Sequence, residues 1–96
     1  MRNAAAAVIG CIAIAAAAAA SAEPPAGAAS CSGCHPTSPR LTSPVPRLAG
    51  VDRAAIVRAM QDFRSGQRAG TVMDRIAKGF TDEEVAAIAA WFAAQK

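Results

Sequence analysis

Residues 31–35 read Cys31-Ser32-Gly33-Cys34-His35, and this stretch decides what the rest of the chain folds around. Two thiols three positions apart, followed at once by an imidazole, form the C-x-x-C-H pattern of covalent haem attachment. Thiols at this spacing reach the two vinyl groups on one porphyrin edge, and the adjacent histidine then ligates the iron. The sequence therefore predicts one haem c on Cys31 and Cys34, with His35 as the proximal iron ligand.

Two other uses of this cysteine pair were weighed against haem attachment. A redox dithiol or a disulfide of the thioredoxin type belongs to a βαβ fold, and no stretch of this sequence alternates like a strand. A zinc site needs four ligands, whereas the sequence holds one histidine and three cysteines in all. Haem attachment is the interpretation that remains.

A second axial ligand is expected for an electron-transfer haem, and methionine is the natural choice because His35 is the only histidine. Two methionines qualify. Met60 falls on a helical stripe with Ile56 and Phe63, a spacing more typical of core packing. Met73 follows a glycine-containing loop that brings a thioether close to the iron. Met73 is therefore the predicted distal ligand.

The first 22 residues have the pattern of a secretory signal peptide. A short basic start is followed by an apolar run over 4–20, by Ala20-Ser21-Ala22 and by Glu23-Pro24-Pro25. We expect cleavage after Ala22, a periplasmic location, and a mature cytochrome c domain at 23–96 without a stable membrane span.

Two other fates of this N-terminal run stay open. It could remain as a membrane anchor, although alanine is only weakly apolar and an anchor wants about 20 strongly apolar residues. Val8-Ile9-Gly10-Cys11 also fits a lipobox in form, although cleavage there would leave a second apolar run behind.

The remaining chain is too short to be stabilised by a large hydrophobic core alone, and it holds no tyrosine. A bound haem would replace the missing aromatic core. We predict an all-α fold, a small cytochrome c fold of three to five short helices wrapped around one covalent haem. The expected helices are 23–30, 52–65, a short turn over 73–78, and a last helix capped by Thr81 with Glu84 in a T-x-x-E capping box.

Residues 36–46 hold four of the six prolines and are predicted to form a loop. A proline carbonyl near Pro46 is a candidate acceptor for the Nδ1–H of His35, which would fix the imidazole tautomer. The alternative is that Pro44 and Pro46 merely stiffen the loop. The sequence does not separate these two roles.

The charges exclude one class of function. The net charge is +3, and no cluster of basic residues with interleaved aromatics marks a nucleic-acid surface. Arg47, Arg75 and Lys78 are candidates for a contact with a haem propionate or a partner, but solvated surface charges are the expectation for each. Trp91 and Phe92 are expected to pack the last helix against the first near Gly27.

Several stretches together resemble a known family. Cys31 to His35, Pro46-Arg47-Leu48-Ala49-Gly50 and Phe63-Arg64-Ser65-Gly66 are similar to small single-haem cytochromes c. The stretch from Thr71-Val72-Met73 to Glu84, with Ala90-Trp91-Phe92-Ala93, resembles the cytochrome subunit of flavocytochrome c sulfide dehydrogenase. The resemblance covers almost all of 23–96. It departs after His35, where Pro36 opens a proline-rich loop and relatives often have glycine.

This resemblance implies that Met73 is the distal iron ligand and that the chain is not an enzyme by itself. It further implies a larger FAD-containing subunit that oxidises sulfide, and electrons that pass from flavin to haem and on to another carrier. A freely diffusing carrier between a dehydrogenase and a terminal oxidase is the main alternative. A gas-binding haem protein is a third, and methionine ligation argues against it.

Overall fold

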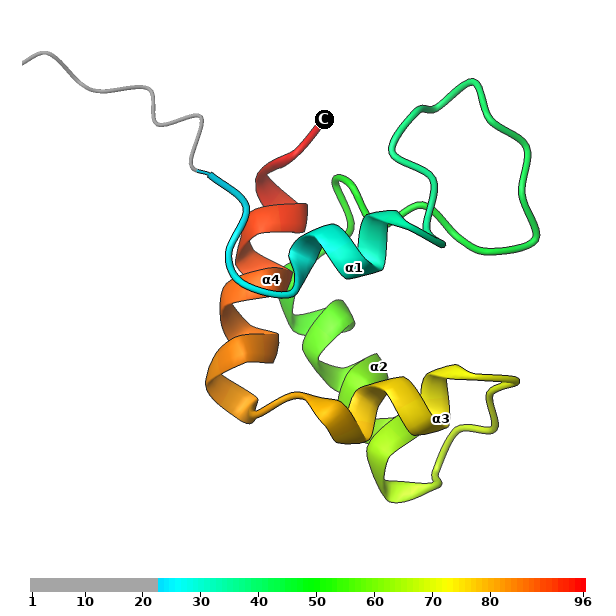
Figure 1. Ribbon diagram of the computed structural model, residues 1–96, viewed down its shortest axis with the longest axis vertical. Coiled ribbons are helices and arrows are strands. Elements are labelled where there is room, and N and C mark those ends of the chain that lie inside the picture. Colours follow the sequence, from blue (N-terminus) through cyan, green and yellow to red (C-terminus); the bar gives the residue numbers. More distant parts are fainter. Residues whose placement is uncertain (1–22) are drawn as a thin grey trace, which may run out of the picture.

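The computed structural model describes residues 23–96, and the predicted signal peptide lies outside them. Its elements are α1 (Ala28–Ser32), α2 (Arg53–Ser65), α3 (Met73–Ile76), the 3-10 helix η1 (Ala77–Gly79) and α4 (Asp82–Ala94). Residues 23–96 contain no strand, so the predicted all-α class of a few short helices is confirmed (Figure 1). None of their helices has the length and apolar character needed to cross a bilayer.

The two long helices, α2 and α4, lie against each other and form the frame of the fold (Figure 1). Helix α2 begins where the Asp52 carboxylate accepts the main-chain N–H of Ala55 at 3.1 Å, which satisfies one free donor of the first turn. It ends at Gly66, whose φ of +82° suits glycine. The expected 52–65 helix is thus confirmed.

Helix α4 begins with the predicted capping box. The Thr81 hydroxyl accepts the N–H of Glu84 at 3.1 Å, and the Glu84 carboxylate accepts the N–H of Thr81 at 3.0 Å. Acidic residues fill the first turn, where they face the positive end of the helix dipole. These short-range signals explain why the start of this helix could be predicted from the sequence.

The core lies where α1 crosses the middle and C-terminal half of α4. Its buried members are Ala28, Ile56, Ile88, Ala89 and Phe92, and half-buried side chains around them include Cys31, Leu48, Val51, Val57, Phe80 and Trp91. Ala28 of α1 and Ala89 of α4 are both fully buried, so small side chains from these two helices share one core. The core therefore joins the predicted haem-attachment helix directly to the last helix.

The first helix differs from the prediction at both ends. It was expected over 23–30, before the cysteines, but α1 runs from Ala28 to Ser32 and includes Cys31. The reason is Gly27, whose φ of +89° lies outside helical geometry. The N–H of Ala28 donates instead to the carbonyl of Pro25 at 3.1 Å, which closes a turn before the helix starts.

The contact near Gly27 also differs from the prediction. Trp91 and Phe92 were expected there. A Cβ at Gly27 would instead lie 2.6 Å from the Phe80 ring and 3.3 Å from the Ile88 side chain. Phe92 is buried in the shared core, and Trp91 stands edge-on to it with ring centroids 4.8 Å apart. Phe80 directly follows η1, and Ile88 lies in α4. The close approach at Gly27 therefore brings together the start of α1, the end of η1 and α4.

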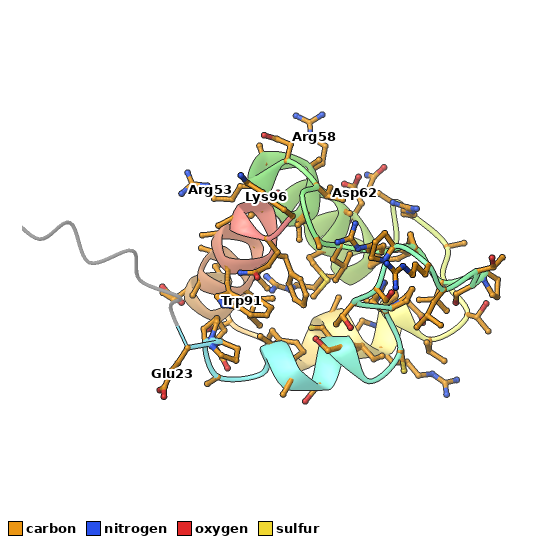
Figure 2. All side chains as sticks on the ribbon, turned by 90° about the horizontal axis from the view of Figure 1, so that it is seen from above. Glu23, Arg53, Arg58, Asp62, Trp91 and Lys96 are labelled. Atoms are coloured by element: carbon orange, nitrogen blue, oxygen red, sulfur yellow. The ribbon has the colours of Figure 1, made fainter. Side chains whose placement is uncertain are left out.

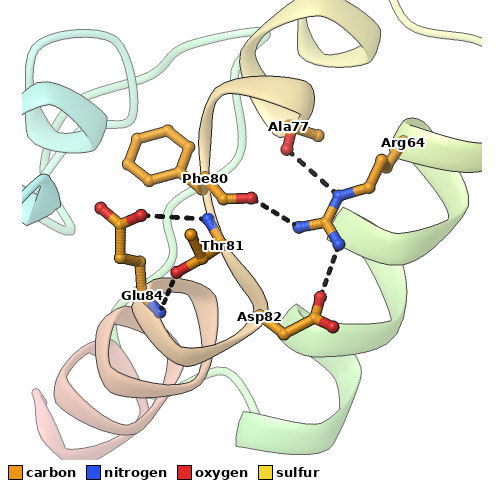
Figure 3. A network of polar contacts seen from close by, with 6 residues as sticks. All are labelled: Arg64, Ala77, Phe80, Thr81, Asp82 and Glu84. Carbon is orange, nitrogen blue, oxygen red and sulfur yellow. Dashed lines mark hydrogen bonds and ion pairs between the residues drawn. The ribbon is translucent and has the colours of Figure 1, made fainter.

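Arg64 near the end of α2 ties that helix to the segment between α3 and α4 (Figure 3). Its guanidinium donates to the carbonyl oxygens of Ala77 at 3.4 Å and Phe80 at 2.8 Å, and it pairs with Asp82 at 2.5 Å. The Asp82 side chain is 76% exposed, so this ion pair contributes little. The carbonyl bonds matter more, because Ala77 is fully buried and its oxygen would lose a partner.

Replacing Arg64 with alanine is expected to cost about 2 kcal/mol of unfolding free energy, from the lost carbonyl bonds. For a domain of this size the melting temperature would then fall by about 8–16 °C. Arg58→Ala is the matched control, because Arg58 is exposed on the same helix (Figure 2). Thermal unfolding followed by circular dichroism measures both variants, and equal melting temperatures would contradict this role for Arg64.

Candidate haem site

The two predicted attachment cysteines lie one helical turn apart at the end of α1. The N–H of Cys34 donates to the carbonyl of Cys31 at 3.1 Å, and the N–H of His35 donates to the same oxygen at 2.8 Å. Residues three apart in such a turn share one face. Both thiols are free, with Cys31 half-buried and Cys34 exposed. The fold therefore places both cysteines on one turn, immediately before the buried histidine.

The environment of Cys31 is unlike that of a redox-active thiol. Burial raises the pKa of its thiol above the usual value, and a main-chain hydrogen bond offsets this in part. The thiol also donates to the carbonyl of Gly27 at 3.6 Å. Reactive dithiol pairs have a lowered thiol pKa, because the thiolate is the nucleophile. The direction of the shift at Cys31 is thus opposite to that of a thiolate nucleophile.

His35 is the one polar side chain of the described residues that is buried, at 8% exposure. Its Nδ1 lies 2.5 Å from the carbonyl oxygen of Pro46. A carbonyl oxygen only accepts, so Nδ1 carries the proton and the neutral ring keeps its lone pair on Nε2. Nε2 is then the atom that can bind a metal. Of the two roles weighed for the prolines, the structure supports the carbonyl acceptor.

The two candidate distal ligands lie on adjacent elements. Met60 is in the middle of α2, and Met73 is the first residue of α3. Both side chains are half-buried. A Cβ at Gly70 would lie 2.9 Å from the Phe63 ring and 3.3 Å from the Cβ of Met73. The absence of a side chain at Gly70 therefore lets the loop before Met73 pass closely over α2.

The three basic residues that were expected to be surface charges fall into two groups. Arg75 and Lys78 are exposed, as expected. Arg47 is half-buried, and its guanidinium donates to the carbonyl oxygens of Thr37 at 3.2 Å and Lys96 at 2.8 Å. Arg47 is therefore a partly exposed charge that also bridges two main-chain oxygens, and the surface-charge expectation did not include this bridge. The sequence carried no signal for it, because one of its partners is 49 residues away.

Comparison with known proteins places these features in a family. A stretch of 71 residues, 70% of the chain, is 33% identical to cytochrome c-554(548) of Halomonas halodenitrificans and spans 86% of that protein. The chain belongs to the c-type cytochromes. Membership implies haem c as the cofactor, which agrees with the C-x-x-C-H motif on α1. No protein-family model matches the chain.

Other c-type cytochromes similar to this chain include longer proteins. The cytochrome subunit of sulfide dehydrogenase from Chlorobaculum tepidum is 44% identical over 63 residues, which are 66% of this chain and 57% of that protein. Cytochrome c4 of Pseudomonas aeruginosa is 35% identical over 72 residues, 74% of this chain and 36% of that protein. The resemblance read from the sequence is confirmed, although this cytochrome matches little more than half of the sulfide dehydrogenase subunit.

Proposed function

We propose that this chain is an exported electron-transfer cytochrome with one haem attached through Cys31 and Cys34, and with His35 and Met73 as the axial iron ligands. The donor set fits such a group: two thiols on one turn, a buried imidazole whose Nε2 is available to bind the iron, and a half-buried thioether at the start of α3. When bound, the haem supplies one-electron exchange between Fe(II) and Fe(III). The protein's own part is to hold the ligands and to exclude water from one face of the haem.

The exposed apolar side chains support this proposal. Within the described residues, the large apolar side chains that face solvent are Leu41 at 63%, Val72 at 53% and Ile76 at 40%. Leu41 lies in the proline-rich loop that follows His35, and the other two flank Met73. Exposed apolar side chains in the loop after His35 and around Met73 suit a large apolar cofactor or the partner that docks beside it.

The likeness to the Chlorobaculum tepidum subunit supports a more specific role. In this role the chain accepts electrons from the FAD-containing subunit of a flavocytochrome c sulfide dehydrogenase and passes them to a further carrier. The oxidation of sulfide belongs to the flavoprotein, so this chain is an electron-transfer subunit rather than the catalyst. The match of 44% identity is the observation that carries this proposal.

A second candidate is a freely diffusing carrier to a terminal oxidase or another acceptor. The likeness to cytochrome c-554(548), most of whose length the chain spans, favours it. In both roles residues 1–22 act as a signal peptide, and residues 23–96 form a periplasmic cytochrome c domain. The two roles differ in whether a flavoprotein binds stably.

Co-expression separates the two roles. The chain, with cytochrome c maturation proteins, is produced together with the product of its neighbouring gene and is purified through a tag on this chain. The sulfide dehydrogenase role predicts flavin bands that co-purify with the haem spectrum, and haem reduction on adding sulfide. A lone haem protein that sulfide reduces slowly or not at all would favour the free carrier.

A further inference from the structure

The carbonyl that orients the His35 imidazole belongs to a peptide whose next residue is firmly anchored. Pro46 supplies that carbonyl, and Arg47 follows it directly. The Arg47 guanidinium bridges the carbonyl oxygens of Thr37 and Lys96. Thr37 lies two residues after His35, and Lys96 lies just beyond α4. One side chain therefore connects the start of the proline-rich loop, its end and the C-terminal end of α4.

The same segment has a second attachment to α4. The N–H of Gly50 donates to the carbonyl of Phe92 at 3.0 Å, and the Leu48 side chain packs against the core. Residues 48–50 are thus attached to α4 and to the core independently of Arg47. The stretch from Pro36 to Pro46 has no helix, and its main-chain and side-chain bonds are mostly short-range turns. Arg47 reaches across this loop beside the hydrogen bond between His35 and Pro46.

We propose that Arg47 is a positioning residue for the proximal ligand, which acts through the Pro46 carbonyl and not on the iron itself. This inference rests on the proposed function. A planar guanidinium donates in two directions at fixed geometry, so it holds the Thr37 and Lys96 carbonyls at a set separation. The Pro46 carbonyl is then kept in line with the Nδ1–H of His35. Loosening this bridge weakens that hydrogen bond without removing any atom of it.

Two measurable properties depend on this hydrogen bond. A strong acceptor at Nδ1 makes the imidazole a better electron donor to the iron, which favours Fe(III) and lowers the reduction potential. It also protects the Nδ1 proton from exchange with water. Weakening the bond is therefore expected to raise the potential and to speed that exchange. A role in stability alone would move neither property.

The test compares Arg47→Gln, Arg47→Lys and Arg40→Gln in the purified holoprotein. Arg40 is an exposed arginine of the same loop, so its variant makes the same change in charge without disturbing the bridge. Arg47→Lys keeps the charge but lacks the planar fork. The readouts are the midpoint potential and, by NMR of the reduced protein, the exchange rate of the His35 Nδ1 proton.

Both Arg47 variants are expected to show a raised midpoint potential and about tenfold faster exchange of the His35 Nδ1 proton, because they lose charge-assisted hydrogen bonds that hold the loop. Arg40→Gln is expected to stay near the wild type in both readouts. If Arg47→Gln matches Arg40→Gln in both readouts, or if Arg47→Lys restores wild-type values, the positioning role is overturned. If Arg47→Gln does not yield holoprotein, the lysine variant decides alone. A wild-type chain without haem would instead refute the proposed function.

Discussion

Met73→Ala is expected to abolish the weak near-infrared absorption band of Fe(III) bound to a methionine sulfur. The reason is that Met73 supplies the predicted thioether ligand at the start of α3, where the glycine-containing loop brings it past α2. Methionine ligation raises the potential, so its loss is also expected to lower the midpoint potential. Near-infrared spectroscopy of the oxidised protein and a redox titration measure the two effects.

Met60→Ala is the control, because both methionines are half-buried and lie on adjacent helices. Removing the Met60 side chain is expected to keep the band and to destabilise the protein, by about 2–3 kcal/mol for a partly buried methionine. If Met60→Ala removes the band and Met73→Ala keeps it, the two assignments must be exchanged. Burial does not distinguish the two methionines, because both are half-buried, so this comparison decides which of them binds the iron.

Among the glycines of residues 23–96, Gly27 is the one where replacement by alanine is expected to destabilise the protein most. A Cβ there would lie 2.6 Å from the Phe80 ring, and the φ of +89° is unfavourable for any residue with a side chain. Strain of about 1 kcal/mol and overpacking of about 1–3 kcal/mol together give about 2–4 kcal/mol. The melting temperature of the holoprotein would fall by about 8–32 °C.

Gly66→Ala separates the two causes. Gly66 has a similar φ of +82°, but a Cβ there would meet nothing within 4 Å. This variant is expected to lose only the strain term, about 1 kcal/mol. Equal melting temperatures for the two variants would show that the Phe80 ring moves aside at no cost, and the close packing of α1 would then lose its importance.

The parts of the fold that the sequence predicted well depend on short-range chemistry. The capping box joins Thr81 to Glu84, three residues apart, and the C-x-x-C-H motif spans a single turn. Each of these two patterns carries its geometry within a few neighbouring residues. The Pro46 acceptor for His35 was predicted only as one of two roles, and it joins residues 11 positions apart.

The features that were missed depend on contacts between distant residues. Arg64 reaches Phe80, and Arg47 reaches Lys96, across 16 and 49 positions. An isolated arginine in a sequence gives no sign of which carbonyl it meets. The start of α1 was misplaced for a related reason, because only the structure shows that Gly27 adopts a positive φ beneath Phe80.

These long-range contacts explain how a chain with few aromatic residues holds a ligand set in place. Arg64 fixes the segment that follows Met73, and Arg47 joins the loop that carries the Pro46 carbonyl to the end of α4. In both cases a guanidinium donates to main-chain oxygens of segments that are distant in the sequence. Small domains rely on such staples because their cores are small.

The central claim is that haem is bound covalently through Cys31 and Cys34. The most direct measurement is the mass of the holoprotein after denaturation in acid and extraction with organic solvent, conditions that remove any non-covalent haem. The account predicts a polypeptide heavier by one haem, with the added mass on the peptide that contains Cys31 and Cys34. A bare polypeptide mass, with all haem in the solvent, would contradict it.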